Sequence, residues 1–282
     1  MCQGAFTFLS PRRFGSIYFV LGELALVKAL VLRAAGTNCD KETAFAFEAA
    51  GAAASLCHIN ALKEDPKKLL GYQIVCIPGG FTYGDDIAAG TVLALQIRLF
   101  LQDVLLEFLD SGGIILGICN GFQVLTKCGL LPRLDGSTQQ CVTLAANDSA
   151  RFEDRWVHLV CTTTRSVLLQ KGERLFLPVA HAEGKLVTDN GTLERLFDEQ
   201  LVALRYTDPR GRATQRYPDN PNGSCGAVAA LCDTTGRVLG MMPHPERHIF
   251  THHHPFWQRV GRRDGEGDGM RIFRRAVAFF KG

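Results

Sequence analysis

The chain has 282 residues, of which 46% are hydrophobic, and a formal net charge of only +3. This length is enough for one large domain or two small ones. No dense run of Lys and Arg is interleaved with aromatic residues, so the composition gives no support for nucleic-acid binding. The ten cysteines form no C-x-x-C pair, which favours free thiols in a reducing compartment. We therefore expect a cytoplasmic protein.

The first 26 residues differ in character from the rest. They contain Arg12 and Arg13 and no acidic residue before Glu23. Glu23 and Lys28 interrupt the apolar stretch, which argues against a secretory signal and against a membrane span. An organellar transit peptide and an extension without function both remain open. We treat residues 1–26 as an N-terminal extension of uncertain role, and residues 27–282 as the functional domain without a membrane segment.

Short apolar runs then alternate with helical patterns. Strands are predicted at residues 29–34, 72–78 and 113–119, and helices at 41–52 and 87–109. Asp85 and Asp86 are available to cap the second helix. Continuous apolar strands separated by helices are typical of a parallel sheet covered on both faces.

The second half of the chain has a different pattern. Residues 225–242 predict a hairpin that turns at Asp233–Gly236. Residues 271–280 space Phe273, Val277 and Phe280 for a packed terminal helix. The whole predicts one α/β domain with an antiparallel extension.

Cys119 follows a buried strand and precedes a helical pattern, in the stretch "GICNG". Such a corner presents a nucleophile beyond the carboxyl end of a strand, beside the N–H groups of the new helix. Gly117 and Gly121 remove side chains that would collide there. The helix N-terminus stabilises a thiolate. A buried cysteine in a tight turn is the alternative.

A thiolate nucleophile needs a base, and "MMPHPER" offers His244 with Glu246 two residues later. A residue before proline is driven towards extended conformations. We therefore expect an extended segment with both side chains on one side, so that Glu246 orients the imidazole. A Cys–His–Glu set has the logic of nucleophile, base and orienting group.

"GICNGFQ" together with a late "HPE" resembles the triad-type, or class I, glutamine amidotransferases. The segments "RAAGTNCDKE", "PGGFTYGDDIAAG", "HAEGK", "NPNGS" and "GMMPHPER" occur in this order. Together they resemble the glutaminase subunits of phosphoribosylformylglycinamidine synthase, from about Lys28 to Phe280. The resemblance implies a flavodoxin-like fold: a central, mostly parallel sheet with helices on both faces and an antiparallel extension.

The resemblance also implies a role for each motif residue. Cys119 would form a γ-glutamyl thioester, His244 would move the proton, and Glu246 would hold the imidazole. Backbone N–H groups near Gly80 and Asn120 would form the oxyanion hole. Gln123 would line the glutamine pocket.

By the same resemblance, ammonia passes to a large synthetase subunit, which uses ATP to aminate formylglycinamide ribonucleotide in purine biosynthesis. A small third subunit is also implied. The chain contains no G-x-x-x-x-G-K-[ST] loop. We therefore expect no cofactor and no metal in this chain, with ATP and magnesium on the partner.

Other candidate groups have alternative explanations. His181 and Glu183 share the i, i+2 spacing of the proposed pair and could supply a competing base, or line the site or an interface. Asp85 and Asp86 could face the partner. Three consecutive histidines at 252–254 cannot all reach one ion, so we expect a solvated loop. Cys39 has no base in its own segment and is interpreted as structural.

Two functions from other classes compete with this interpretation. One is a free-standing cysteine hydrolase, for which the Phe-Thr-Tyr-Gly-Asp-Asp stretch at 81–86 is not expected. The other is a catalytically dead binding module that only regulates a synthetase. The fold alone would not require Cys119, His244 and Glu246 together, and their presence argues against the second.

Overall fold

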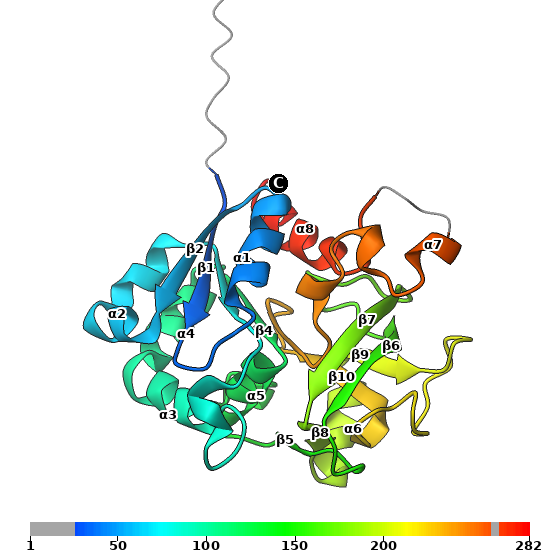
Figure 1. Cartoon of the computed structure of the whole chain (residues 1–282). Coiled ribbons are helices and arrows are strands. Elements are labelled where there is room, and N and C mark those ends of the chain that lie inside the picture. Colours follow the sequence, from blue (N-terminus) through cyan, green and yellow to red (C-terminus); the bar gives the residue numbers. More distant parts are fainter. Residues whose placement is uncertain (1–25, 261–264) are drawn as a thin grey trace, which may run out of the picture.

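The computed structural model describes residues 26–260 and 265–282. The extension predicted at residues 1–26 lies, except for its last residue, outside this part. The main sheet there consists of β1 (Lys28–Arg33), β2 (Ala53–His58), β3 (Ile74–Ile77), β4 (Ile114–Ile118), β6 (Glu153–Cys161), β7 (Arg174–His181), β9 (Val202–Thr207), β10 (Val228–Cys232) and β11 (Val238–Met241). Their order across the sheet is β2-β1-β3-β4-β11-β10-β9-β6-β7 (Figure 1).

One half of this sheet is parallel. β2, β1, β3, β4 and β11 run in the same direction, with pairs such as Val75↔Ile115 and Leu239↔Leu116 in register. Every residue of β3 and β4 is buried, as continuous apolar runs in a covered parallel sheet require. The three strands predicted from the sequence are β1, β3 and β4, and the predicted class of fold is confirmed.

The other half of the sheet is antiparallel. β10 pairs antiparallel with β11 through Leu231↔Gly240, and the turn closes with the Gly236 N–H donating to the Asp233 carbonyl. The predicted hairpin is therefore confirmed. β9, β6 and β7 extend the sheet antiparallel. A separate two-stranded sheet joins β5 (Thr143–Ala146) to β8 (Glu183–Val187).

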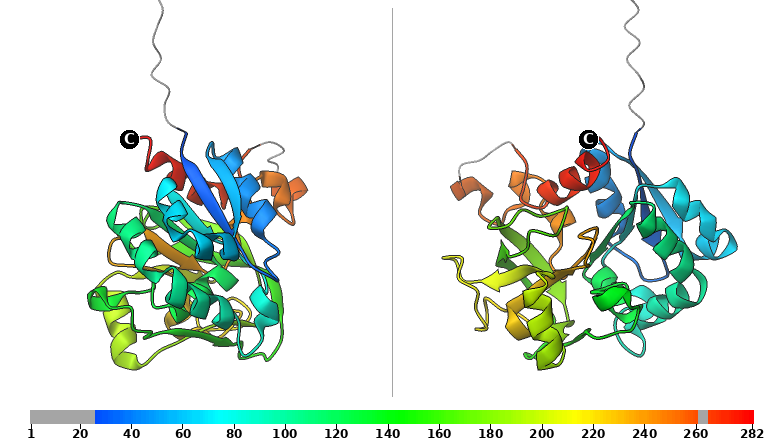
Figure 2. Two further views of the ribbon diagram at one scale, coloured as in Figure 1. Left: turned by 90° about the vertical axis from the view of Figure 1, so that its left-hand side faces the viewer. Right: turned by 180° about the vertical axis from the view of Figure 1, so that it is seen from behind.

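Helices cover both faces of the parallel half, as predicted. They are α1 (Asp40–Ala49), α2 (Ile59–Glu64), α3 (Thr91–Phe100), α4 (Gln102–Asp110), α5 (Asn120–Lys127) and α8 (Met270–Ala278), with α6 (Asn190–Asp198) and α7 (Trp257–Val260) in the antiparallel half. The chain steps from β1 to β2 in one direction across the sheet and from β3 to β4 in the other. Right-handed crossovers then place α1 on one face and α3, α4 and α5 on the opposite face (Figures 1 and 2).

The prediction of one long helix at 87–109 is wrong in two respects. The observed helix begins only at Thr91, after Gly90 with a left-handed φ of 73°. It also breaks at Leu101, whose φ of −127° is not helical. The apolar spacing runs through the break without interruption, because Ile97, Leu101 and Leu105 are all buried. Periodicity therefore could not reveal that the backbone turns there.

The terminal helix packs as its spacing predicts. Phe273 and Val277 of α8 are buried, and Phe280 is partly buried against the same core. The Phe273 ring meets Phe47 of α1 edge to face, with 4.9 Å between centroids. Within the described residues, no helix is both long and apolar enough to cross a membrane.

Two glycines let α5 approach the sheet at the site corner. A Cβ at Gly121 would lie 1.9 Å from the carbonyl oxygen of Ile77, and one at Gly117 would lie 2.8 Å from the carbonyl oxygen of Gly121. The predicted need for small residues on both sides of Cys119 is therefore confirmed. The closest obstacle at Gly121 is a backbone atom, which cannot rotate away, whereas at Gly117 the Leu125 side chain lies closer still, at 2.5 Å.

Gly121→Ala is expected to lower the free energy of unfolding by about 3 kcal/mol, the upper range for overpacking a core. Urea denaturation measures the change. Gly71→Ala is the matched control, because no atom lies within 4 Å of the position that its Cβ would take, and it is expected to stay within about 0.5 kcal/mol. Equal effects of the two substitutions would contradict the packing argument.

Candidate active site

Cys119 occupies a strained corner between β4 and α5. Its φ of 50° and ψ of −104° lie outside the usual regions for a residue with a side chain. The corner is held because the Cys119 N–H donates to the Met241 carbonyl at 2.7 Å and its own carbonyl accepts from Phe122. Strain of this kind costs about 1–3 kcal/mol and persists only where the surroundings impose it. The side chain is 5% exposed.

His244 and Glu246 form a buried pair. His244 Nδ1 lies 2.6 Å from Glu246 Oε1, and the two residues are 1% and 2% exposed. The predicted pairing is confirmed, but the predicted extended backbone is wrong beyond His244. Residues Pro245–Arg247 form a 3-10 turn, with proline at the first position, where its missing N–H costs nothing. The turn brings the carboxylate back to the ring.

The charge of this pair is set by opposing effects. Burial by itself would lower the pKa of His244, but the Glu246 carboxylate and the thiols that face the ring outweigh it and hold this pKa well above its usual value. An imidazolium stabilises a neighbouring thiolate. His244 Nε2 has no hydrogen-bond partner within the described part of the chain, so it is available to the Cys119 thiol.

Cys119 and His244 line one small cavity of about 170 Å³, whose mouth carries Phe81 and Phe152. Gly79 makes room for the imidazole, because a Cβ there would lie 2.7 Å from His244 Cε1. The candidate nucleophile and base thus come from the carboxyl ends of β4 and β11. Neighbouring parallel strands bring these two ends together.

A second cavity of about 220 Å³ adjoins Cys119 on its other side. Its lining includes Gly80, Gln123, His181, Glu183 and Asp85. Most of the predicted site residues therefore surround Cys119. Asp86 does not: it is exposed and lines neither cavity.

Asn120 and Gln123 are held by a polar network under the second cavity. The Asn120 side-chain amide donates to Asp85 Oδ1 at 3.1 Å and to Gln123 Oε1 at 2.9 Å, and its oxygen accepts from Thr82 Oγ1 at 2.6 Å. Gln123 in turn donates to the Glu183 carbonyl. Asp85 also accepts from the Gly90 N–H, so it supports the start of α3 as well as the site.

The N–H groups of Gly80 and Asn120, predicted to form the oxyanion hole, have no competing acceptor in the described part of the chain. Among the described residues, neither N–H donates to a backbone or side-chain acceptor. Gly80 has a φ of 148°, and a Cβ there would lie 2.8 Å from the Asn38 nitrogen. Only glycine fits this position.

His181 lies beside the site but is a poor base. Asn147 Oδ1 accepts from the Gly184 N–H at 3.0 Å and lies 3.1 Å from His181 Nδ1, so Nδ1 carries the proton. Burial, together with the nearby His244, lowers the pKa of His181 to about 3. In contrast to His244, it has an amide and not a carboxylate behind the ring. Asn147 had no recognisable pattern in the sequence.

The interpretation of Cys39 as purely structural missed its surroundings. It precedes α1, and its Sγ accepts from Arg247 Nη2 at 3.1 Å. The same sulfur lies within 4.8 Å of a ring nitrogen of His244 and a carboxylate oxygen of Glu246. Burial raises the pKa of the Cys39 thiol, so it is a neutral thiol at pH 7. The base next to it comes from another segment, which local sequence could not indicate.

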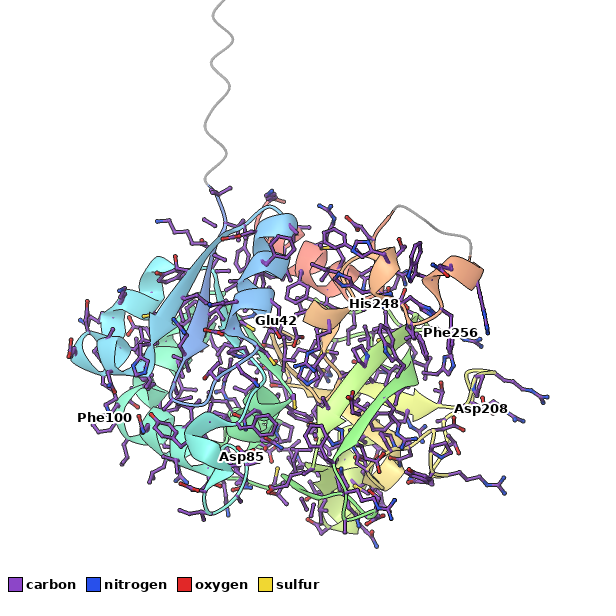
Figure 3. All side chains as sticks on the ribbon, viewed as in Figure 1. Glu42, Asp85, Phe100, Asp208, His248 and Phe256 are labelled. Carbon is purple, nitrogen blue, oxygen red and sulfur yellow. The ribbon has the colours of Figure 1, made fainter. Side chains whose placement is uncertain are left out.

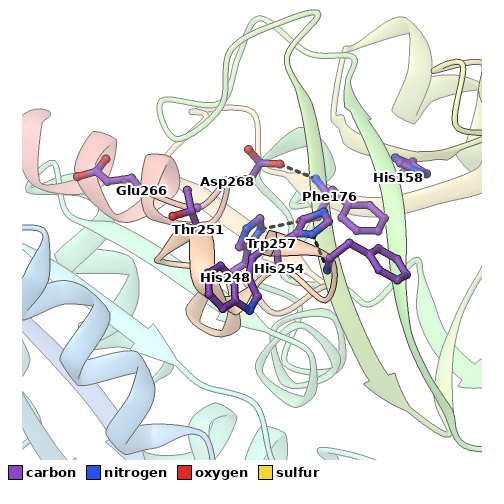
Figure 4. A pocket seen from close by; sticks show the side chains of 10 residues that line it. His158, Phe176, His248, Thr251, His254, Trp257, Glu266 and Asp268 are labelled. Atoms are coloured by element: carbon purple, nitrogen blue, oxygen red, sulfur yellow. Dashed lines mark hydrogen bonds between the residues drawn. The ribbon is translucent and has the colours of Figure 1, made fainter. Parts of the chain in front are cut away.

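A larger cavity, of about 430 Å³, lies elsewhere, beside β7 (Figure 4). It is lined by aromatic rings and histidines, among them Phe176, Trp257 and His248, and by no cysteine. Figure 3 shows His248 and Phe256 well apart from Asp85. In the described part of the chain, histidines 252–254 do not converge with thiols or acids on one point. That they hold no metal stays a prediction.

Residues 26–280 match the CobB/CobQ-like glutamine amidotransferase domain, and the chain belongs to that family. The PurQ subunit of phosphoribosylformylglycinamidine synthase from Dehalococcoides mccartyi is 45% identical over 257 residues, which are 90% of this chain and 98% of that protein. The PurQ subunit from Methanococcus maripaludis strain C5 is 40% identical over 270 residues, covering 90% and 98%. Within the amidotransferases, the chain therefore groups with the PurQ subunits.

A solved structure agrees with this assignment. A chain in the structure of PurLQS from Thermotoga maritima matches with 27% identity and a TM-score of 0.66, over 90% of this chain and 99% of that one. Because the match spans nearly all of both chains, it includes the parallel and the antiparallel half of the sheet. The resemblance inferred from the motifs is confirmed.

The low pKa of His181 has a consequence for acid stability. An unfolded chain has histidine with a pKa of ~6.5, whereas folded His181 stays neutral down to about pH 3. As pH falls below ~6.5, the unfolded chain binds a proton that the folded chain rejects, so the free energy of unfolding decreases. We expect His181→Gln to lose less stability than the unmodified protein between pH 7 and pH 4.5. Urea denaturation at both pH values measures this, and parallel losses would contradict it.

Proposed function

We propose that this chain is a glutaminase that hydrolyses glutamine at Cys119 and supplies the ammonia to a synthetase subunit. The observation that carries the proposal is one cavity in which a cysteine on a strained corner meets a buried His–Glu pair. Strained, desolvated nucleophile and base pairs are characteristic of covalent catalysis. The family assignment gives the substrate class.

In the first step, the Cys119 sulfur attacks the carboxamide carbon of glutamine. Its proton resides on His244 Nε2 and passes from there to the departing ammonia, which leaves a γ-glutamyl thioester. Glu246 accepts from Nδ1–H and keeps the ring in place. The negative charge that develops on the carbonyl oxygen is met by the N–H groups of Gly80 and Asn120. Each donor of this kind contributes roughly 3–4 kcal/mol in comparable enzymes.

In the second step, water hydrolyses the thioester. His244 Nε2, now neutral, takes a proton from water, which adds to the thioester carbon. The intermediate collapses, Cys119 leaves as the thiolate beside the His244 imidazolium, and the new γ-carboxyl group of glutamate loses its proton to solvent. The same nitrogen thus serves as acid and base in turn.

The second cavity has the chemistry to hold the amino-acid end of glutamine. It presents the Asp85 and Glu183 carboxylates, which complement an α-ammonium group. Glu183 is oriented by the Ala89 N–H at 3.1 Å, and Asp85 by Asn120. Gln123 supports this wall through the Glu183 carbonyl. His181, neutral at physiological pH, is a further wall of this pocket.

The mouth of the site supports docking of a partner. Phe81 and Phe152 are about half exposed, and their ring centroids are 6.2 Å apart. Ile87, on the same loop as Asp85 and Asp86, is 90% exposed. Large apolar side chains that are exposed together commonly mark protein interfaces. We propose that the large synthetase subunit covers the exposed side chains of Phe81, Phe152 and Ile87. We also propose a small third subunit in the complex, by analogy with PurLQS from Thermotoga maritima.

The full reaction is then shared between chains. The synthetase would use the ammonia, with ATP, to convert formylglycinamide ribonucleotide into formylglycinamidine ribonucleotide. ATP and magnesium would bind to that partner, and the glutaminase steps on this chain would need no cofactor. The free thiols of the nine described cysteines support a reducing compartment, and we propose the cytoplasm.

The competing functions have less support. A free-standing hydrolase would have no use for the exposed apolar rim beside its site. A dead regulatory module would not need the charge pair, since a buried charge is costly to maintain without a function.

Cys119→Ala is expected to abolish glutamine hydrolysis and to leave the fold intact, because the smallest side chain still suits the corner. An electrophile that mimics glutamine, followed by peptide mass mapping, should label Cys119 alone. Cys141→Ala removes a half-buried thiol outside both cavities and serves as the control. This variant should be labelled at Cys119 to the same extent as the unmodified chain. Labelling at Cys39 or Cys128 in place of Cys119 would overturn the assignment.

The partner should control the rate. Ammonia that is released without an acceptor is protonated in water and lost to the reaction. We therefore expect glutamine hydrolysis to become fast only when the synthetase binds and closes the site. We expect the synthetase, with nucleotide and acceptor, to raise glutamate release by at least about tenfold, ~1.4 kcal/mol of barrier. Glutamate is measured with and without the reconstituted partner. An isolated chain that already runs at the full rate of the complex would favour the free-standing hydrolase.

A further inference from the structure

Three groups that bind soft divalent cations converge at the active site. The Cys39 sulfur, a ring nitrogen of His244 and a carboxylate oxygen of Glu246 all lie within 4.8 Å of one another. Cys39 precedes α1, whereas the other two follow β11, so the cluster exists only in the folded chain. Thiolate, imidazole and carboxylate are the donors that zinc takes in proteins.

We propose that Cys39, His244 and Glu246 bind a thiophilic divalent cation such as Zn²⁺, and that the bound cation switches the glutaminase off. The site is inhibitory and is distinct from any cofactor of the reaction. The binding stands on the geometry of these three residues alone, and the inhibition rests on the proposed function.

The distances suit a tetrahedral ion after a small adjustment. Zinc bonds of about 2.0–2.3 Å place neighbouring ligand atoms roughly 3.3–3.8 Å apart. The widest pair in the cluster, at up to 4.8 Å, therefore closes by about 1 Å, which side-chain rotation can supply. Three protein ligands leave a fourth position for water or for the Cys119 sulfur.

One observation points to a missing ligand at this position. Glu246 Oε2 is buried and has no hydrogen-bond partner within the described part of the chain. Buried polar atoms without partners are uncommon in native structures and call for an explanation. A path also exists, because Cys39, His244 and Cys119 line the same cavity as the half-exposed Phe81 and Phe152.

The local charges permit a cation. Arg247 contacts the Cys39 sulfur at 3.1 Å and opposes metal binding, but Glu42 lies 3.9 Å from the same guanidinium and offsets its charge. Asp154 lines the cavity as a further carboxylate. When zinc binds, the Cys39 thiol and the His244 imidazolium each release one proton to solvent. The thiolate and the Glu246 carboxylate then neutralise the two charges of the ion.

Inhibition follows whichever ring nitrogen binds the metal. If Nε2 binds, the lone pair that accepts the Cys119 proton is lost. If Nδ1 binds, the neutral ring carries its proton on Nε2 and donates towards Cys119, so it cannot accept. In both cases Glu246 is also drawn away from its role of orienting the ring, and the proton shuttle stops.

Cobalt gives a test of binding that does not depend on activity. The full chain, reduced and stripped of metal, is titrated with Co²⁺, and the thiolate-to-cobalt charge-transfer band is recorded in the near ultraviolet. Zn²⁺ should displace the band. Cys39→Ser and Cys39→Ala should each lose it and weaken zinc binding by at least about tenfold, since even the loss of a group that only supports a metal ligand costs about 10–100-fold. Cys141→Ser, the matched control, should keep it. Circular dichroism checks that each variant is folded.

The outcomes separate the alternatives. Loss of the charge-transfer band in the Cys39 variants supports the site. If Cys119→Ser also weakens the band, the Cys119 sulfur is the fourth ligand. A band that persists in the Cys39 variants but vanishes in Cys119→Ser would place the metal on the nucleophile and overturn the proposal, as would no band in the unmodified chain.

Glutamate release tests the inhibition separately. Each variant is compared with its own metal-free rate, and the zinc concentration for half inhibition should rise at least about tenfold in Cys39→Ser. Equal zinc sensitivity of Cys39→Ser and the unmodified chain would overturn the inhibitory role. If the chain released no glutamate under any condition, the proposed function would fail while the cobalt result would still decide the metal site.

Discussion

Four neighbouring parallel strands, β1, β3, β4 and β11, end at the same edge of the sheet, and the candidate nucleophile, base and oxyanion donors depend on this constraint. The loop after β1 leads to Cys39, the loop after β3 contains Gly80, the corner after β4 is Cys119, and the turn after β11 begins with His244. These loops are far apart in the sequence, but they lie close together in space because the hydrogen-bonded register of the parallel strands aligns the strand ends. β7, from the antiparallel half, closes the site with His181.

The site keeps one imidazole charged and another neutral within the same buried volume. His244 has a carboxylate at 2.6 Å, which compensates for the loss of water around the cation. His181 has only the Asn147 amide oxygen beside its ring. This neutral group does not offset the free-energy cost of burying a second positive charge. The difference of one functional group behind the ring therefore decides which histidine can move protons. The sequence spacing of the two His–Glu pairs is identical and could not decide it.

Two thiols face the same imidazole and differ in backbone. Cys119 is held on a left-handed corner, with N–H groups of a new helix beside it and a cavity on either side. Cys39 lies in an ordinary conformation before α1, is in contact with Arg247, and reaches only one cavity. The proposed catalytic and regulatory roles can share one histidine because its ring has two nitrogens and two faces.

The sequence by itself determined the class of fold, the corner at Cys119 and the pairing of His244 with Glu246, because each is encoded in residues close together in the chain. Apolar runs, the glycines at 117 and 121, and a proline-flanked His–x–Glu are local signals. Only the tertiary structure decided that the helix predicted at 87–109 breaks at Leu101, that Pro245–Arg247 turns, that Asn147 keeps His181 neutral, and that Cys39 joins the His244–Glu246 pair. These features depend on contacts between segments up to about two hundred residues apart, such as Arg247 with Cys39. No local pattern carries that information, since the energy that selects each arrangement arises only when the chain has folded.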